Sequence, residues 1–235
     1  MVAGPLKPQF SVIIPTRNRE DYLRQAVSSV LAQRDVSFEV LVVNDGEHLL
    51  QQFSDPRISV LDNAKRTAVP ARNLGLEFAK GEFIAFLDDD DFWIDDLHLS
   101  KALSAFQQSA DFYFANGEMH FADGTVKLFD HAATAESLKH DNTILISAVC
   151  YRRSLNNELG AFDESIPYYW DWDWYLRVAS SGAIIRHQSK PAVAIRVHAG
   201  NMSNQNDIAR RANLDALIAK HRLGPIPLKN HTNFV

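Results

Sequence analysis

The sequence lacks several features that would each define a class of protein. Cys150 is the only cysteine, so no disulfide can form within the chain, as is usual for proteins of a reducing compartment. No apolar run reaches the roughly 18 residues needed to cross a bilayer, and residues 1–9 contain two prolines and no apolar signal segment. We therefore expect a cytoplasmic protein without a transmembrane segment, for which peripheral contact with the inner face of the membrane stays open.

Several ligand-binding signatures are also missing. Lysine and arginine form no block and the formal net charge is −5, which disfavours nucleic acid as a partner because such binding needs a basic surface. No Cys/His cluster is present, which excludes a zinc site of the usual kind. Pro15-Thr16-Arg17 follows the first apolar run, where a glycine-rich phosphate loop would otherwise stand. Cys150 lies in an apolar run, so we expect a buried, unreactive thiol.

The residues that are present predict an α/β protein. Hydrophobic residues make up 46% of the chain and charged residues 23%, as in ordinary globular proteins. In the first half, short apolar runs typical of buried strands alternate with segments of helical periodicity. The predicted strands are Phe10–Ile14, Phe38–Val43, Arg57–Leu61 and Glu82–Leu87, and the predicted helices contain Leu23–Leu31, Ala71–Ala79 and Leu99–Phe106. Asn18 is the predicted cap of the first helix and Gly81 the predicted stop of the second. This alternation predicts a Rossmann-like α/β/α sandwich with a mostly parallel central sheet.

The second half of the chain is less regular. The turn Ala122-Asp123-Gly124 predicts a hairpin between Phe112–Phe121 and Thr125–Phe129. The further predicted elements are strands at Ile144–Tyr151, Ile184–His187 and Ala192–Val197, a helix at Trp170–Ser180 that ends at Gly182, and a C-terminal helix that reaches about Leu223.

Polar clusters follow three of the predicted strands, at Pro15–Arg19, Asn44–Gly46 and Asp88–Asp91. Ligands of parallel sheets bind outside the carboxyl ends of the strands, so these clusters should meet in one crevice. Four adjacent carboxylates repel one another unless something neutralises them, and carboxylate oxygens are natural ligands of Mg²⁺ and Mn²⁺. Alternate residues of an extended segment point the same way, so Asp88 and Asp90 can share one metal. The alternative is an acidic turn that stabilises the start of the next helix; the position at the end of a buried strand favours the metal.

Several segments resemble motifs of the family 2 glycosyltransferases with the GT-A fold. The resemblance covers about residues 10–203, and the order of the motifs makes it specific although each motif alone is weak. The segments similar to donor-side motifs are Ser11–Arg19, Val42–Gly46, Pro70–Gly75 and Gly81–Trp93, and those similar to acceptor-side motifs are Gly160–Glu164, Asp171–Arg177 and Arg196–Ser203.

The resemblance implies which residues bind the donor. Asp45 would hydrogen-bond the nucleobase and Asp88 would contact the ribose. The other residues implied to bind the nucleotide-sugar are Pro15, Thr16, Arg17, Arg72 and Asp89. Asn44 departs from the family pattern, in which an aspartate is common, but the neighbouring carboxylate of Asp45 remains, so base binding should survive.

The resemblance also implies a metal site. Asp90 would bind Mn²⁺ or Mg²⁺ directly, together with Asp88, and Asp91 would support the site. His198 would contact the metal or the diphosphate, and a hydrogen-bonded structural histidine is the competing interpretation. A divalent cation would relieve the repulsion between an acidic chain and a diphosphate.

The expected catalytic base lies in the tryptophan-rich segment. The resemblance implies Asp171, with Asp173 as the alternative because Trp170 stands where the family often has a glutamate. Both aspartates also fit a structural role as first-turn charges favoured by the helix dipole. Trp170, Trp172 and Trp174 cannot all face inward on one helix, so at least one is expected on the surface or in the cleft. Trp170 and Trp172 are candidates for stacking on an acceptor sugar, with core packing as the competing account.

These features predict a metal-dependent, inverting glycosyltransferase that moves a sugar from a nucleoside-diphosphate sugar, most often UDP in this family, to a glycan or lipid-linked acceptor. The expected parts are an N-terminal tail (1–9), a nucleotide-sugar-binding half (10–115), an acceptor-binding half (116–204), and a C-terminal helix and tail (205–235). One alternative is a nucleotidyltransferase-like enzyme, which would usually need a glycine-rich loop with a lysine. Another is an inactive nucleotide-sugar-binding module, which would be expected to have lost Asp90 or the later acidic pair.

Overall fold

The structure is a computed structural model that describes residues 7–47, 52–198, 201, 207–229 and 233. Its first half contains the expected alternation of strands and helices. The strands are β1 (Phe10–Thr16), β2 (Phe38–Asn44), β3 (Ile58–Asp62) and β4 (Phe83–Phe86), and the helices are α1 (Glu20–Leu31), α2 (Ala68–Phe78) and α3 (His98–Gln107). The four strands pair in parallel, in the order β3-β2-β1-β4. Every residue of β1 and β2 is buried, which explains why both strands are mostly apolar, since a central parallel strand has no solvent face. The buried polar side chains of Ser11 and Glu39 hydrogen-bond each other.

The second half extends the same sheet with mixed pairings. Its strands are β5 (Phe92–Trp93), β6 (Phe112–Phe121), β7 (Val126–Phe129), β8 (Val149–Arg152) and β9 (Ile185–Val197), and its helices are α4 (Ser154–Leu159), α5 (Trp170–Ser180) and α6 (Asp207–His221), with 3₁₀ turns at Ser137–Lys139 and Ile146–Ala148. Strand β9 runs parallel to β6, whereas β8 is antiparallel to β4 and β6, and β5 to β9. The hairpin of β6 and β7 is confirmed.

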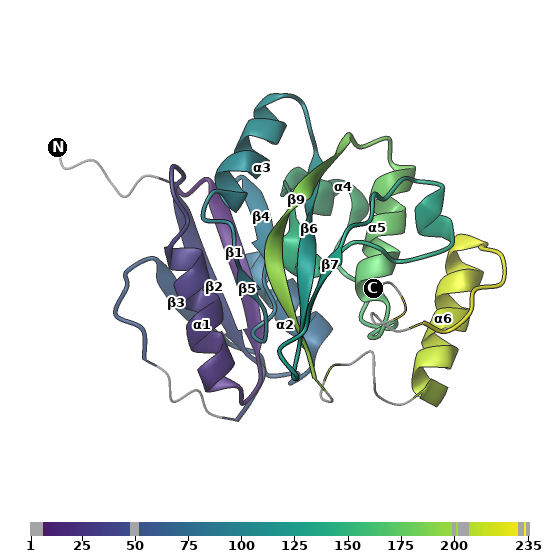
Figure 1. The fold of residues 1–235 in the computed structure, drawn as a ribbon, viewed down its shortest axis with the longest axis horizontal. Helices are drawn as coiled ribbons and strands as arrows, with labels where there is room; N and C mark the ends of the chain where they lie inside the picture. Colours follow the sequence, from purple (N-terminus) through teal and green to yellow (C-terminus); the bar gives the residue numbers. More distant parts are fainter. Residues whose placement is uncertain (1–6, 48–51, 199–200, 202–206, 230–232, 234–235) are drawn as a thin grey trace.

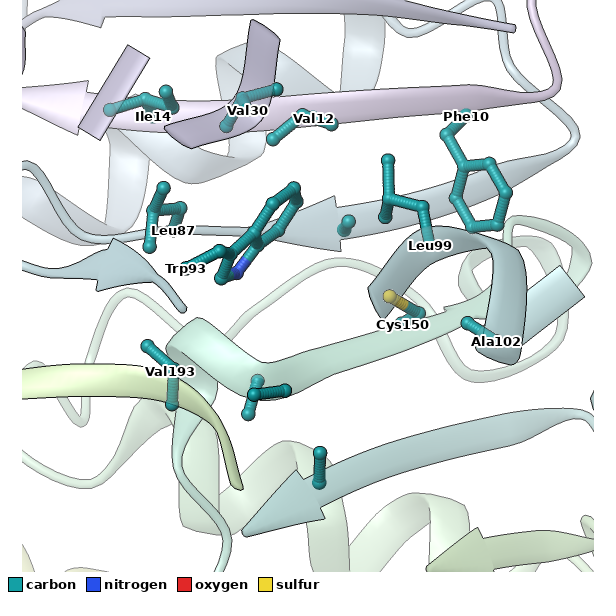
Figure 2. Close-up of a cluster of buried hydrophobic side chains, with 14 of the residues drawn as sticks. Phe10, Val12, Ile14, Val30, Leu87, Trp93, Leu99, Ala102, Cys150 and Val193 are labelled. Atoms are coloured by element: carbon teal, nitrogen blue, oxygen red, sulfur yellow. The ribbon is translucent and has the colours of Figure 1, made fainter. Parts of the chain in front are cut away.

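In the described part of the chain, the sheet has nine strands in the order β3-β2-β1-β4-β8-β6-β9-β5, with β7 paired to β6 (Figure 1). Helices cover both faces. One buried cluster joins one face of the sheet to α1 and α3 through side chains such as Val12, Val30 and Leu99 (Figure 2). A second cluster on the other face joins Ile13 and its neighbours to α2, α5 and α6. The predicted α/β/α sandwich is therefore confirmed, while the division of the chain at residue 115 stays a prediction.

Several predictions about local structure were wrong, and two of them concern β9 and Asn18. The runs Ile184–His187 and Ala192–Val197 belong to one long strand, β9, because irregular register opposite Asn116 lets it continue along β6 past the polar residues between them. Asn18 does not cap the first helix: the residue before α1 is Arg19, and Asn18 has a left-handed φ of 55°. Asparagine tolerates that conformation, so Asn18 turns the chain sharply from β1 toward α1.

The apolar run 144–151 is a strand only at its end, since a 3₁₀ turn precedes β8. Cys150 in β8 is buried, as expected, and burial raises the pKa of its thiol. No helix in the described ranges is long and apolar enough to cross a membrane.

Gly81 has a packing role that the sequence did not reveal. Helix α2 already ends at Phe78, so Gly81 is not its stop signal. A Cβ atom at Gly81 would lie 2.5 Å from the backbone N of Ser11 and 2.6 Å from the carbonyl carbon of Phe10. The absence of a side chain therefore lets the chain pass close to the start of β1.

We expect Gly81→Ala to destabilise the fold, because the neighbouring atoms are backbone and cannot move aside easily. The expected loss is about 1–3 kcal/mol of the free energy of unfolding, as for overpacking elsewhere, measured by urea denaturation. Gly224→Ala is the matched control, since no atom lies within 4 Å of a Cβ placed there. Equal unfolding midpoints for the two variants would contradict the packing argument.

Candidate active site

The strand ends line one cleft of about 830 Å³. Its walls come from the ends of β1, β2 and β4, from the start of α5, and from α6 and the residues after it. The predicted site residues that line it are Pro15, Thr16, Arg17, Asp45, Arg72, Asp88, Asp89, Asp90, Trp170, Asp171 and Trp172. The structure therefore brings most of the predicted donor-side and acceptor-side residues together.

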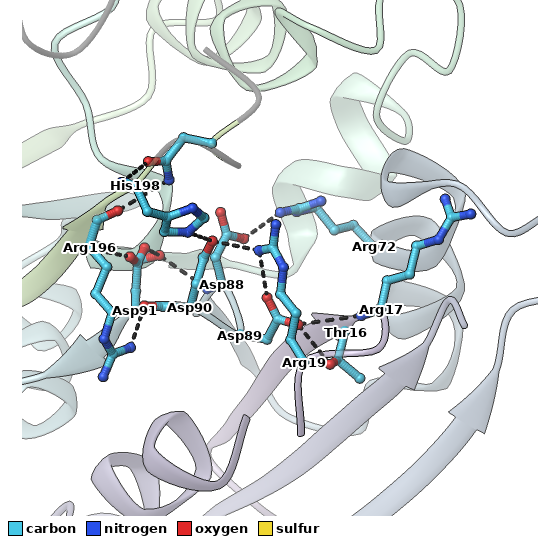
Figure 3. A network of polar contacts seen from close by, with 12 residues as sticks. Thr16, Arg17, Arg19, Arg72, Asp88, Asp89, Asp90, Asp91, Arg196 and His198 are labelled. Atoms are coloured by element: carbon cyan, nitrogen blue, oxygen red, sulfur yellow. Dashed lines mark hydrogen bonds and ion pairs between the residues drawn. The ribbon is translucent and has the colours of Figure 1, made fainter. Parts of the chain in front are cut away.

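The four residues of the aspartate run all line this cleft, and Figure 3 shows their polar contacts. Asp88, Asp90 and Asp91 each offer a carboxylate oxygen, and these oxygens lie within 4.8 Å of one another. The Arg72 guanidinium pairs with Asp88, and Nη1 of Arg19 lies 2.5 Å from Oδ2 of Asp90. The oxygens are close enough to share one divalent cation, and arginines supply the neutralising charge in this arrangement.

Asp91 is turned into the protein. Its Oδ2 accepts a 2.6 Å hydrogen bond from the Ser147 hydroxyl, and its Oδ1 accepts one of 3.2 Å from the Arg196 amide. Burial and the neighbouring carboxylates raise its pKa well above the ordinary value. With both oxygens hydrogen-bonded by the protein, Asp91 is placed to hold the run in position, and its role in supporting a metal stays a prediction.

Asp89 ties the run to the end of β1. Its Oδ2 accepts a 2.7 Å hydrogen bond from the Thr16 hydroxyl and a 3.3 Å bond from the Arg17 amide. Burial raises the pKa of Asp89 to about 6, and the Thr16 bond and Arg19 partly oppose this. The Arg17 side chain extends away from the carboxylates, so only its backbone takes part in this contact (Figure 3).

His198 reaches the run from the end of β9. Its Nε2 lies 3.0 Å from Oδ2 of Asp90, its ring stacks on Tyr22 at 6.1 Å, and its amide donates to Asn201 Oδ1. The histidine is thus held beside the candidate metal ligands, which is compatible with either expected role. Part of its predicted motif, residues 199–200 and 202–203, lies outside the described residues.

Asp45 directly follows β2, is buried and lines the cleft. Its Oδ1 accepts a 2.7 Å hydrogen bond from Asn63 Nδ2. Burial raises the pKa of Asp45, against the lowering effect of that bond. The neighbouring Asn44 does structural work: its amide nitrogen donates to Asp62 and its oxygen accepts the Gly46 amide. Asn44 thus has a local reason to be an amide, and Asp45 keeps a place on the cleft wall.

The structure separates the two candidate bases. Asp171 lines the cleft and is held by hydrogen bonds from Asn142 Nδ2 at 2.9 Å and the Trp172 amide at 2.8 Å. Burial raises the pKa of Asp171, and these two bonds oppose the rise. A raised pKa makes a carboxylate a better proton acceptor.

Asp173 is fully buried and is absent from the residues that line the cleft. His221 Nε2 and Lys220 Nζ each lie 2.7 Å from its Oδ1, and Arg177 Nε lies 3.0 Å from its Oδ2. Burial acts to raise its pKa, but the bonds from His221 and Lys220 outweigh burial and lower it. Asp173 joins α5 to α6, so its geometry fits the structural interpretation.

The three tryptophans of α5 are all buried in one core cluster, so the expectation that they cannot all face inward was wrong. Trp170 and Trp172 also line the cleft, as expected for at least one of the three. The Arg72 guanidinium lies 4.4 Å from the centre of the Trp170 ring, and Trp172 Nε1 donates to the Leu138 carbonyl. Both cleft tryptophans are thus fixed in place by protein contacts.

Four polar residues at the site received no role from the sequence. Arg19 belonged to a predicted strand-end cluster, and this position was its only indication of a role at the site. Ser147, Asn63 and Asn142 carry no local pattern, because each acts on a carboxylate far away in the chain: Asp91, Asp45 and Asp171 respectively.

A Rossmann-like sheet with an acidic cluster at its strand ends, and a further carboxylate in the same cleft, fits the class of glycosyltransferases with the GT-A fold. Comparison with known proteins agrees with this class. The model of glycosyl transferase family 2 matches residues 11–159, and the chain belongs to this family.

Two relatives illustrate the family. The uncharacterized glycosyltransferase YwdF of Bacillus subtilis is 33% identical over 94% of this chain and 87% of its own length. The UDP-Glc:alpha-D-GlcNAc-diphosphoundecaprenol beta-1,3-glucosyltransferase WfgD of Escherichia coli is 32% identical over 71% of this chain and 67% of its own length.

Solved structures show the same fold. The S. aureus TarS 1–349 structure in complex with UDP-GlcNAc superposes with a TM-score of 0.71 at 20% identity, over 90% of this chain and 66% of the TarS chain. The mannosyltransferase PcManGT of Pyrobaculum calidifontis, in complex with GDP-Man and Mn²⁺, gives a TM-score of 0.65 at 17% identity, over 95% of this chain and 67% of that one.

Proposed function

We propose that this glycosyltransferase is metal-dependent and inverting, and that it transfers a sugar from a UDP-sugar to a hydroxyl group of a growing glycan or a lipid-linked glycan. One observation carries the proposal: the convergent oxygens of Asp88, Asp90 and Asp91 and the carboxylate of Asp171 belong to the same cleft.

The acidic cluster fits a divalent cation. Asp90 would hold Mn²⁺ or Mg²⁺, with Asp88 and His198 beside it, since carboxylate oxygens and imidazole both suit Mn²⁺. When bound, the cation would neutralise the charge of the diphosphate leaving group. The Mn²⁺ in the complex of PcManGT supports this assignment.

The nucleotide would lie along the strand ends. Asp45 would accept a hydrogen bond from the nucleobase, in the pocket that Pro15, Thr16 and Arg17 line. Arg72 is buried and fixed between Asp88 and Trp170, so it would present a rigid positive charge to the donor. UDP as the nucleotide is supported by the UDP-GlcNAc complex of TarS and by the UDP-Glc in the name of WfgD.

Asp171 would accept the proton of the attacking hydroxyl. Its place on the cleft wall and its raised pKa both suit a general base. Attack on the anomeric carbon from the side opposite the diphosphate would invert the configuration there. Trp170 and Trp172 would contact the acceptor, and the diphosphoundecaprenol-linked acceptor in the name of WfgD supports a lipid-linked glycan.

The decisive experiment is a screen of nucleotide-sugars with Mn²⁺ or Mg²⁺, read as release of nucleoside diphosphate. We expect release from a UDP-sugar that requires the cation and stops in EDTA. Full activity in EDTA would contradict the metal. Release of pyrophosphate from a nucleoside triphosphate and a sugar phosphate would instead support a nucleotidyltransferase.

Removing the Asn142 side chain should change the pH dependence of transfer. The hydrogen bond from Asn142 stabilises the charged form of Asp171 and lowers its pKa. In Asn142→Ala that pKa rises further, so the base is protonated at a higher pH. The acidic limb of the kcat/KM profile should therefore move to higher pH.

The profile is measured between about pH 4 and 8, which spans the range in which a carboxylate with a raised pKa titrates. The same substitution in an Asp171→Asn background is the control, because no limb due to Asp171 should remain there to move. An acidic limb that stays in place in Asn142→Ala would speak against Asp171 as the base.

A further inference from the structure

Arg19 occupies an unusual position among the cleft arginines. It precedes α1 and reaches back so that its Nη1 lies 2.5 Å from Oδ2 of Asp90 and 3.3 Å from Oδ1 of Asp89 (Figure 3). Its side chain provides no capping hydrogen bond to α1. The position of the guanidinium is therefore explained by the carboxylates and not by the helix.

The oxygen that Arg19 contacts belongs to the candidate metal ligand. Oδ2 of Asp90 also lies 3.0 Å from His198 Nε2, so this oxygen already has two nitrogen neighbours. A divalent cation on Asp90 would repel a guanidinium at hydrogen-bond distance from the same carboxylate. Arg19 and the cation therefore compete for Asp90.

Arg19 and Arg72 differ in their burial and in the contacts that hold them. The Arg72 side chain is 7% exposed and is held by Asp88, by the Ala68 carbonyl and by the Trp170 ring. The Arg19 side chain is 35% exposed, and the carboxylates are the partners that hold it. Arg72 is fixed by its surroundings, whereas Arg19 can leave Asp90 without opening the core.

A released Arg19 would still lie on the wall of the cleft that takes the donor. Its planar guanidinium carries several N–H donors in a geometry that matches phosphate oxygens. A diphosphate beside Asp90 is the nearest new anion that the proposed reaction supplies.

We propose that Arg19 is an internal counter-ion of the metal site, which leaves Asp90 when the divalent cation binds and then binds the diphosphate of the donor. This inference rests on the proposed function. It makes cation binding and nucleotide binding favour each other, because the cation frees the residue that the nucleotide needs. By linkage, each ligand then strengthens the other by the same factor.

The test compares wild type with Arg19→Gln. The affinity for Mn²⁺ alone is measured from the paramagnetic resonance of free Mn²⁺, and the affinity for UDP is measured by calorimetry, with Mn²⁺ and with EDTA. Arg19→Gln should bind Mn²⁺ alone more tightly, because a competing charge is gone. It should bind UDP like wild type in EDTA and more weakly in Mn²⁺, with changes of about 5–150-fold, the usual range of coupling between two sites.

Arg24→Gln is the matched control. Arg24 lies on α1, the helix that Arg19 precedes. Its side chain is 62% exposed and lies 3.7 Å from Asp21, so the variant removes the same charge without changing the cleft. A general loss of positive charge would affect both variants equally. A purely structural role of Arg19 would weaken UDP binding with and without Mn²⁺ alike.

The failures of the two proposals are distinguishable. If wild type bound UDP and Mn²⁺ and Arg19→Gln behaved like Arg24→Gln, the counter-ion role would be overturned and the proposed function would stand. A wild-type protein that bound no Mn²⁺ in the presence of UDP would overturn both.

Discussion

Asp90→Asn should lose Mn²⁺ binding and transfer sugar about a thousandfold more slowly than wild type. The asparagine keeps the shape of the side chain but removes the charge from the oxygen that Arg19 and His198 now contact. A cation at a leaving group typically contributes several kcal/mol of transition-state stabilisation, and about 4 kcal/mol corresponds to three orders of magnitude in rate. The measurements are nucleoside diphosphate release at saturating donor and direct titration of Mn²⁺.

The substitution should not harm the fold. Asp90 loses its ion pair with Arg19, which keeps its contact with Asp89, but removing one of four adjacent carboxylates also relieves repulsion, so thermal stability should change little. Asp21→Asn is the control for a lost negative charge, because the Asp21 side chain is fully exposed on α1. If the Asp90→Asn enzyme turned over as fast as wild type, and did so in the presence of EDTA, the proposed metal dependence would be contradicted.

Asp171→Asn is the second substitution with a large expected effect. If Asp171 accepts the proton of the acceptor, kcat should fall by about 10²–10⁴-fold, the usual contribution of general base catalysis. The affinity for UDP should be unchanged, since the donor-side residues at the strand ends are untouched. Steady-state kinetics and UDP calorimetry on the same preparation separate the two effects.

Asp173→Asn gives the contrast. The Asp173 side chain has no exposed area and lies between Arg177, Lys220 and His221, so losing its charge weakens the contacts that join α5 to α6. Removing one member of a buried ion pair costs about 3–5 kcal/mol, and the cost here should lie below that range because the three positive groups are partly exposed. We expect a lower melting temperature with kcat largely kept below that temperature. A stable Asp173→Asn enzyme with a collapsed kcat would reverse the assignment of the two aspartates.

The elements that were predicted well have strong local signals. Strands β1 and β2 are mostly apolar because they are buried on both faces, and α5 was predicted with the residues that the structure gives it. The errors concern positions whose structure is determined by packing against residues far away in the sequence. Strand β9 continues through polar residues because β6 lies beside it, and Gly81 is required by the backbone of β1 and not by the helix before it.

The same division holds at the site. The positions of Asp45 and of the aspartate run follow from strand ends, which are visible in the chain. Their partners do not: Asn63 on Asp45, Ser147 on Asp91 and Asn142 on Asp171 are brought in by other elements. A single serine or asparagine forms no periodic pattern with its sequence neighbours, so the sequence does not predict such a contact.

By itself, the sequence determined the α/β architecture, the family, and the gathering of acidic residues at one edge of the sheet, because buried strands and their alternation with helices can be predicted from neighbouring residues. Only the tertiary structure decided that Asp171 lines the cleft while Asp173 contacts α6, and that Arg19 pairs with Asp90. Two residues that are two apart on a helix point about 200° away from each other, and pattern alone does not say which direction faces the cleft. That choice is made by contacts across the fold, such as those of Asp173 with His221 and of Arg19 with Asp90.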